Sequence, residues 1–298
     1  MTFGRQLPPG RYRKRPRWSA LALLIVALLP GAHTVANDGE PIELTVVSFN
    51  VLVDLGKPAE FPSWKERREL CVAVLADANA DLIGLQEPTP GQLGYLLQEL
   101  PGYQAHYYRK RDSDPGYTDA VLLYREEVFD VLETGHWWLS PTPDRVSTGF
   151  GNVLPRLLVW AELLHGPSQR RLFAFNTHFD NSLPSQTKMA ALCQERLAAF
   201  AERQRPMIWM GDFNTDQKRG DYSTLVSAGW HDAYVASPLA SEDGRDENVA
   251  TFFNGTRIDH ILYHGSGIQP IEWRRLESPD PQRLLSDHYP ILARLRIE

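Results

Sequence analysis

The chain is expected to fold as an α/β protein in which two packed, mainly antiparallel β-sheets are flanked by helices. Many short apolar runs of strand length follow one another at close spacing, and only a few segments with helical periodicity interrupt them. A regular alternation of strand and helix, which would indicate a parallel sheet, is not seen. With 298 residues, of which 43% are hydrophobic, the chain is long enough to bury a full core.

The N-terminal segment differs from the rest of the chain. Six basic residues precede an apolar run at residues 20–29, and the small residues Thr34 and Ala36 follow. This order is typical of a secretory signal peptide, and the run is shorter than the roughly 20 residues that span a membrane. We therefore predict a signal peptide at residues 1–36 and an exported domain, periplasmic or extracellular, at residues 37–298. The alternative is an uncleaved anchor, residues 18–36, in the cytoplasmic membrane.

Without its first 36 residues the chain is strongly acidic. The whole sequence has 31 Lys and Arg and 37 Asp and Glu, and residues 1–36 hold six of the basic and none of the acidic residues. The remainder therefore has 25 basic and 37 acidic residues, a net charge of −12. Proteins that hold nucleic acid mainly through phosphate contacts are usually basic, so this balance argues against tight, non-specific DNA binding.

The two cysteines, Cys71 and Cys193, both fall inside segments with helical periodicity. An exported chain is able to form disulfides. Positions in the middle of helices, away from turns, favour two buried free thiols. A single bridge between them is the alternative.

The first half of the domain is expected to contain two helices and several strands. Residues 44–51 form an apolar, β-branched run that ends at Asn50, and residues 81–86 form a buried strand. Pro88 and Pro90 prevent this second strand from continuing beyond Glu87. The periodicity also predicts helices at 64–78 and 92–100, strands at 103–108, 120–124, 128–132 and 137–139, and a polar loop at 109–116.

The second half is expected to contain one long helix among further strands, with no linker that would divide the domain. The long helix covers residues 185–203, and a shorter one is predicted near residues 222–227. The expected strands are at 157–164, 172–176, 207–210, 258–263, 271–276 and 291–296.

Polar side chains stand at the ends of these predicted strands. Each has a simple structural explanation when it is taken alone, such as a turn residue or a solvated loop charge. If the strands share one edge, however, the same residues gather four carboxylates, two amides and two imidazoles. They are Asn50, Glu87, His178, Asp212, Asn214, Asp259, Asp287 and His288.

This combination of side chains favours metal-assisted hydrolysis. Oxygen ligands suit a hard cation such as Mg²⁺, Mn²⁺ or Ca²⁺, whereas zinc sites usually contain more His or Cys. The sequence contains no Gly-rich phosphate loop, no nucleophile elbow and no dinucleotide fingerprint. Hydrolysis with a His–Asp acid/base pair is the chemistry that remains, and phosphate is its natural substrate group.

The ordered motifs resemble those of the endonuclease/exonuclease/phosphatase superfamily, which includes deoxyribonuclease I and neutral sphingomyelinases, and in particular its exported bacterial members. The resemblance extends from about Leu44 to the C-terminus, and it implies a four-layered α/β/β/α sandwich with the site at one end of the sheets. The motifs are Ser-Phe-Asn-Val (48–51), Gln-Glu (86–87), Asn-Thr-His-Phe-Asp (176–180), Gly-Asp-Phe-Asn (211–214), Ile-Asp-His-Ile (258–261) and Ser-Asp-His-Tyr-Pro (286–290).

The resemblance also implies a metal site and a phosphate contact. Glu87 would be the principal ligand of a Mg²⁺ or Mn²⁺ ion, with Ca²⁺ as an alternative. Asn50 and Asp287 would lie close to the same cation, and Arg156 would contact the substrate phosphate.

The remaining motif residues would carry out the chemistry. Asp212 and Asn214 would orient or activate the attacking water and touch the phosphate. His288, held by Asp259, would form a His–Asp pair for proton transfer. His178 would donate a hydrogen bond to a phosphoryl oxygen in the transition state.

These expectations define an exported, divalent-metal-dependent phosphohydrolase, with a phosphodiesterase or nuclease as the favoured hypothesis. The alternatives are a sphingomyelinase-like lipid phosphodiesterase, a phosphomonoesterase and a non-catalytic binding module of the same fold. The substrate would be a phosphate ester, with nucleic acid and phospholipid among the candidates, and the protein is expected to be a monomer without a stable protein partner. Abasic-site enzymes have an asparagine where His178 stands, so that repair activity is not expected.

Overall fold

The computed structural model describes residues 40–54, 61–108, 117–238 and 249–298. The predicted signal peptide or anchor and the predicted polar loop at residues 109–116 lie outside the described residues. Within the described ranges, no helix is both long enough and apolar enough to cross a membrane.

Two six-stranded sheets form the centre of the domain, as predicted. Only the pairs β1–β2 and β7–β8 are parallel, and every other described pair is antiparallel. The first sheet has the order β11-β12-β1-β2-β4-β3, from β1 (Ile42–Asn50), β2 (Leu82–Gln86), β3 (Tyr103–Tyr108), β4 (Tyr117–Arg125), β11 (Ile268–Arg275) and β12 (Ile291–Ile297). The second has the order β5-β6-β7-β8-β10-β9, from β5 (Phe129–Trp138), β6 (Leu157–His165), β7 (Arg170–His178), β8 (Met207–Asp212), β9 (Trp230–Asp232) and β10 (Asp259–His264).

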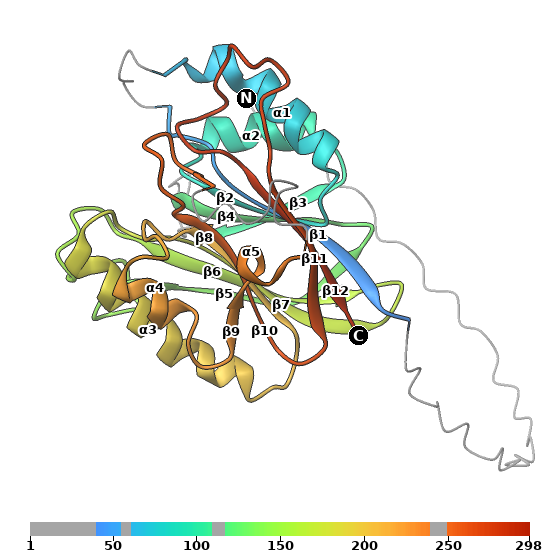
Figure 1. The fold of residues 1–298 in the computed structure, drawn as a ribbon, viewed down its shortest axis with the longest axis vertical. Coiled ribbons are helices and arrows are strands. Elements are labelled where there is room, and N and C mark those ends of the chain that lie inside the picture. The colour runs from blue at the N-terminus through green and yellow to red at the C-terminus, as the bar shows by residue number, and fades with distance from the viewer. Residues whose placement is uncertain (1–39, 55–60, 109–116, 239–248) are drawn as a thin grey trace, which may run out of the picture. The chain divides into compact units, whose positions relative to one another are not determined.

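Helices cover the outer faces of both sheets and complete the four layers (Figure 1). On the first sheet these are α1 (Trp64–Ala78) and α2 (Pro90–Glu99), whose apolar residues join one buried cluster with that sheet. On the second sheet, α3 (Leu183–Ala201) and the short α4 (Gly220–Leu225) contribute to another cluster. A one-turn helix, α5 (Ala233–Ala236), packs beside β11. The structure thus confirms the α/β/β/α architecture.

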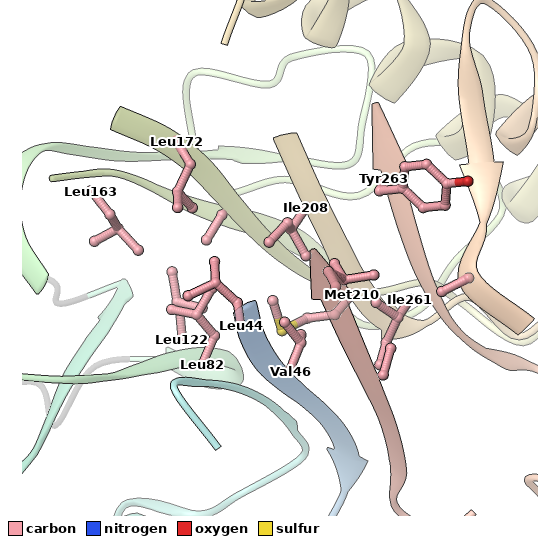
Figure 2. Packing of buried hydrophobic residues seen from close by; sticks show 14 of the residues in the cluster. Leu44, Val46, Leu82, Leu122, Leu163, Leu172, Ile208, Met210, Ile261 and Tyr263 are labelled. Atoms are coloured by element: carbon pink, nitrogen blue, oxygen red, sulfur yellow. The ribbon is translucent and has the colours of Figure 1, made fainter. Parts of the chain in front are cut away.

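The main core lies between the two sheets. Figure 2 shows Leu44, Val46 and Leu82 of the first sheet facing Ile208 and Met210 of the second. Side chains of a strand alternate between its two faces, so the intervening residues of β1 pack outward against the helices instead. Because both faces are covered, these strands appear in the sequence as continuous apolar runs rather than as alternating ones.

Two features differ from the sequence prediction. Strand β5 is continuous over Phe129–Trp138, where two separate short strands were expected. The residues between the two expected strands, 133–136, are polar or glycine and are largely exposed, since β5 is an edge strand. A bulge at Val131 and Glu133 offsets its pairing with β6. The short elements β9 and α5 were not predicted, since three or four residues are too few for a detectable period.

Both cysteines are buried free thiols, in agreement with the favoured expectation. Cys71 lies in α1, between that helix and the first sheet, whereas Cys193 lies in α3, against the second sheet. Burial raises the pKa of Cys71 to about 12, which keeps this thiol protonated and unreactive at neutral pH.

A buried ionic cluster surrounds Asp232, at the end of β9. Its Oδ2 atom accepts hydrogen bonds from the Tyr222 hydroxyl and from Arg257 Nη1, both at 2.8 Å, and lies 3.2 Å from His260 Nδ1. Its Oδ1 atom accepts from the backbone N–H of Tyr234 at 2.9 Å. Burial by itself would raise the pKa of Asp232, but Arg257 and His260 outweigh it and hold this pKa below its ordinary value.

Replacement of Asp232 by asparagine is expected to lower the free energy of unfolding by about 3 kcal/mol at pH 7, because Arg257 would be left buried without its counter-charge. A depressed carboxyl pKa stabilises the fold above the ordinary value of 3.8, and this contribution is lost as the pH falls below it. Urea unfolding of wild type and variant should show a difference in the free energy of unfolding that is smaller at pH 3 than at pH 7. The control variant Asp130→Asn, at an exposed position of β5, should have nearly the same free energy of unfolding as wild type. An equal difference between wild type and Asp232→Asn at both pH values would contradict the prediction.

Candidate active site

Three neighbouring strands of the second sheet bring polar side chains to one edge. β7 and β8 run parallel and end at His178 and Asp212, which are opposite each other in the register. β10 runs antiparallel to β8 and begins at Asp259, also opposite Asp212. Gly211 allows β7 and β8 to approach closely just before this edge, because a Cβ atom at this position would collide with the Thr177 carbonyl oxygen.

The first sheet supplies the other half of the site. Asn50 ends β1 opposite Gln86 of the parallel strand β2, and Glu87 follows Gln86 directly. Glu87 has a φ of 65°, a left-handed conformation that turns the chain away from the sheet. Asp287 and His288 lie in the segment that leads into β12, which is antiparallel to β1.

The Asp212 carboxylate lies at the centre of the site, where the two sheets meet. Its Oδ2 atom is 3.1 Å from Asn50 Nδ2, 3.5 Å from His178 Nε2 and 3.6 Å from His288 Nε2. The same Asn50 nitrogen is 3.2 Å from Glu87 Oε1. Asp212 is only 1% exposed, so the residues around it form a shielded polar cluster.

His288 and Asp259 form the pair that the sequence predicted. His288 Nδ1 lies 2.9 Å from Asp259 Oδ2, and this contact leaves Nε2 directed at Asp212. Burial lowers the pKa of His288, but Asp259 and Asp212 together raise it to about 10. The second oxygen of Asp259 is buried and has no hydrogen-bond partner among the described residues, which leaves an acceptor for a further group.

A carboxylate that the sequence analysis missed supports His178 from behind. Asp119 Oδ1 lies 3.0 Å from His178 Nδ1, and both Asp119 oxygens accept from Arg156 Nη1, at 2.9 and 3.1 Å. Burial raises the pKa of Asp119, but His178 and Arg156 lower it below its ordinary value. For His178, burial and Arg156 lower the pKa while Asp119 raises it, and the net direction is upward. Arg156 Nη1 also lies 2.7 Å from His178 Nδ1, so Asp119 and Arg156 together hold the ring with Nε2 facing the centre of the site.

One signal in the sequence could have indicated Asp119. It immediately precedes the apolar run at residues 120–124, which pairs antiparallel with β2. The start of an antiparallel neighbour lies at the same edge as the end of β2, where Glu87 stands. Arg156, predicted to contact phosphate, is placed near the site but is engaged with Asp119 and lies 4.0 Å from Asp180.

The two predicted amides are both at the site and are both held by the backbone. Asn214 has a φ of 51°, its backbone N–H donates to Asp212 Oδ1 at 2.8 Å, and its Nδ2 donates to the Phe179 carbonyl at 3.0 Å. Asn50 Oδ1 accepts from the N–H of Leu52 at 3.0 Å. Asn50 therefore presents its nitrogen, not its oxygen, to the carboxylates.

The carboxylates provide a suitable environment for a hard cation. Burial raises the pKa of Asp287, His288 opposes this, and the nearby Glu87 adds to it, so the net shift is upward. A cation would relieve the repulsion between these two side chains. One atom each of Asp212, Asp259 and His288 also lie within 4.8 Å of one another and could hold a metal ion. The residues present therefore fit a divalent metal, and they form two separate sets of candidate ligands, Glu87 with Asp287 and Asp212 with Asp259 and His288.

The chain belongs to the endonuclease/exonuclease/phosphatase family, whose sequence model matches residues 47–288. Members of this family hydrolyse phosphoric esters and typically use divalent metals. All nine residues predicted for the site lie at or next to the edge described above, together with Asp119.

Comparisons with individual proteins agree with this assignment. A mannosyl-6-phosphatase from Bacteroides thetaiotaomicron VPI-5482 is 29% identical, with a TM-score of 0.73, over 85% of this chain and 99% of that one. An endonuclease/exonuclease/phosphatase family protein from the same species is 27% identical, with a TM-score of 0.74, over 87% and 100%. An uncharacterised protein of Acanthamoeba polyphaga mimivirus is 24% identical over 82% of this chain and 97% of its own length.

Proposed function

We propose that this protein is a divalent-metal-dependent phosphatase that hydrolyses small, accessible phosphomonoesters such as sugar phosphates. The observation that carries the hydrolytic function is the position of Asp212, whose Oδ2 atom faces His178, His288 and Asn50 from both sheets. Carboxylates and imidazoles in this arrangement suit the transfer of a phosphoryl group to water. The choice of monoesters is supported by the similarity to the sugar phosphatase and by the net charge of −12 at residues 37–298.

The residues of the chain have distinct tasks in this proposal. Glu87 and Asp287 would hold the cation, and a bound cation would neutralise phosphate oxygens and polarise the ester. Asp212 is placed to orient the attacking water and accept its proton. His178 donates Nε2–H to a phosphoryl oxygen, in the orientation that Asp119 and Arg156 impose at Nδ1. The raised pKa of His288 keeps its ring protonated at neutral pH, so that its Nε2–H can donate to the substrate.

A phosphodiester substrate, favoured by the sequence alone, is the second candidate. Phe252 lies against His288, with ring centroids 4.6 Å apart, and its neighbour Phe253 is 56% exposed. Exposed aromatic rings beside a phosphate site are able to stack on nucleobases. This surface is the reason to retain nucleic acid among the substrates to be tested.

Activity is expected to require a divalent metal and to be greatest on monoesters. Purified protein, cleared of metal with EDTA and then titrated with Mg²⁺ or Mn²⁺, should regain activity with each ion. The substrates to compare are mannose 6-phosphate, p-nitrophenyl phosphate, bis-p-nitrophenyl phosphate, DNA, RNA and sphingomyelin vesicles.

The outcome of this panel separates the candidate functions. A kcat/KM for mannose 6-phosphate more than about ten times that for bis-p-nitrophenyl phosphate would support the phosphatase. A tenfold ratio corresponds to about 1.4 kcal/mol of difference in transition-state stabilisation. The reverse preference would replace it with the phosphodiesterase. Full activity in excess EDTA, or no hydrolysis of any ester with either metal, would refute the proposal.

A further inference from the structure

A layer of buried polar side chains lies directly beneath the candidate site, between the two sheets. Ser48, Gln86 and Asn176 are all 0% exposed. Gln86 Nε2 donates to Asn176 Oδ1 at 2.7 Å and to Ser48 Oγ at 3.2 Å. The main apolar core lies between the same two sheets, and polar groups are costly to bury there unless they are hydrogen-bonded.

Asn176 joins the two sheets through both ends of its amide group. Its Nδ2 atom donates to the carbonyl oxygens of Leu85 at 2.9 Å and of Val121 at 2.8 Å, in β2 and β4 of the first sheet. Its Oδ1 atom accepts from Gln86, also in β2. Asn176 itself belongs to β7 of the second sheet. Three hydrogen bonds therefore fix the distance between the sheets at this level.

The spacing of this network matches the spacing of the site. Side chains two residues apart on a strand point to the same face. Asn176 stands two residues before His178 and Ser48 two before Asn50, while Glu87 directly follows Gln86. The side chains of the network thus lie directly behind those of the site on three strands, β7, β1 and β2.

We propose that Asn176 is a positioning residue of the active site, which sets His178 at the correct distance from Glu87 and Asp119 across the two sheets. The inference rests on the proposed function and adds to it a residue that sets the geometry of the active site. The position of Gly84 agrees with it, because a Cβ atom there would lie 2.6 Å from Asn176 Oδ1 and too close to the Met210 side chain. The absence of a side chain at this position of β2 leaves room for the amide of Asn176 and for Met210.

The variant Asn176→Leu has a side chain of similar size and removes all three hydrogen bonds. We expect kcat to fall by about 10–100-fold, the range seen when groups behind a site are lost, with KM changed by less than about threefold. A matched control is Tyr103→Phe, which removes the buried hydrogen bond from the Tyr103 hydroxyl to the Ala80 carbonyl. It should lower the melting temperature and leave kcat unchanged.

A second measurement does not depend on activity. The backbone N–H of Glu87 donates to the Asp119 carbonyl at 3.1 Å, across the strands that Asn176 holds. With the protein cleared of metal by EDTA, hydrogen exchange at the amides of Glu87 and His178 should be faster in Asn176→Leu than in Tyr103→Phe. If Asn176→Leu does not fold, the variant Gln86→Met can replace it. It removes the hydrogen bond from Gln86 to Asn176 Oδ1 and keeps the two that Asn176 Nδ2 donates, so kcat should fall by less than the loss expected for Asn176→Leu.

The outcomes distinguish this inference from the proposed function. A wild type that hydrolyses no phosphate ester would refute the function, while the exchange measurement would still decide whether Asn176 holds the two sides of the site. A folded Asn176→Leu protein with kcat within about threefold of wild type would overturn the positioning role. Equal exchange rates at Glu87 and His178 in the two variants would overturn it as well.

Discussion

Substitution of Glu87 by glutamine is expected to lower kcat/KM by about 10³-fold or more, since a bound cation contributes several kcal/mol to the stabilisation of transition-state charge. Glutamine keeps the size of the side chain and one of its two acceptor oxygens. One Glu87 oxygen accepts from Asn50 Nδ2 at 3.2 Å and the other from the N–H of Val53 at 3.0 Å, so glutamine can keep one of these contacts and loses the other. Thermal melting of the variant therefore separates the loss of charge from a loss of local structure.

Steady-state kinetics at limiting Mg²⁺, together with circular dichroism and thermal melting, would measure this effect. The control is Glu99→Gln, at the exposed end of α2, which should behave like wild type. Excess Mg²⁺ should restore part of the lost activity if Glu87 acts through the metal. Near-normal turnover by a folded Glu87→Gln protein at limiting Mg²⁺ would show that Glu87 is not the principal ligand.

His288 and Asp259 are expected to act as one unit. Each single variant, His288→Ala and Asp259→Asn, should lower kcat by about 10²–10⁴-fold, the range of general acid–base catalysis. The 2.9 Å contact at Nδ1 directs His288 Nε2 toward Asp212, and Asp259 is the largest of the contributions that raise the pKa of the ring against the effect of burial. Without the Asp259 carboxylate the ring would lose the charged partner that fixes its orientation, and its pKa would fall.

The double variant tests the coupling. If the two residues share one task, the second substitution should cost little after the first, and the double variant should be about as active as the poorer single one. His231→Gln, at an exposed histidine of β9, serves as the control for the loss of an imidazole. Losses that multiply in the double variant would mean that the two side chains work independently.

The strand ends of the site could be predicted from the sequence because their signal is local. An apolar run followed at once by a carboxylate, amide or imidazole places that group at a sheet edge, whichever strands are its neighbours. This holds for Asn50, Glu87, His178 and Asp212, each of which ends or directly follows a strand. The two-sheet class follows from the same runs, since their close spacing leaves no room for regular crossover helices.

The edge strands β5 and β9 could not be predicted correctly from local sequence patterns. The exposed middle of β5 has the polarity of a loop, and only its pairing with β6 makes it one continuous strand. Three residues of β9 form a strand because β10 supplies the partner. Edge strands are stabilised by backbone hydrogen bonds to a neighbour, and composition does not record these bonds.

The sequence by itself determined the family, the two-sheet architecture and which polar groups stand at strand ends. The tertiary structure decided how these groups are held. Asp119 is 59 residues from the histidine that it orients, and Gln86 is 90 residues from Asn176, its partner across the two sheets. Such contacts depend on strand register and on the packing of one sheet against the other, because both partners must be buried at the same level. No local pattern of residues contains that information.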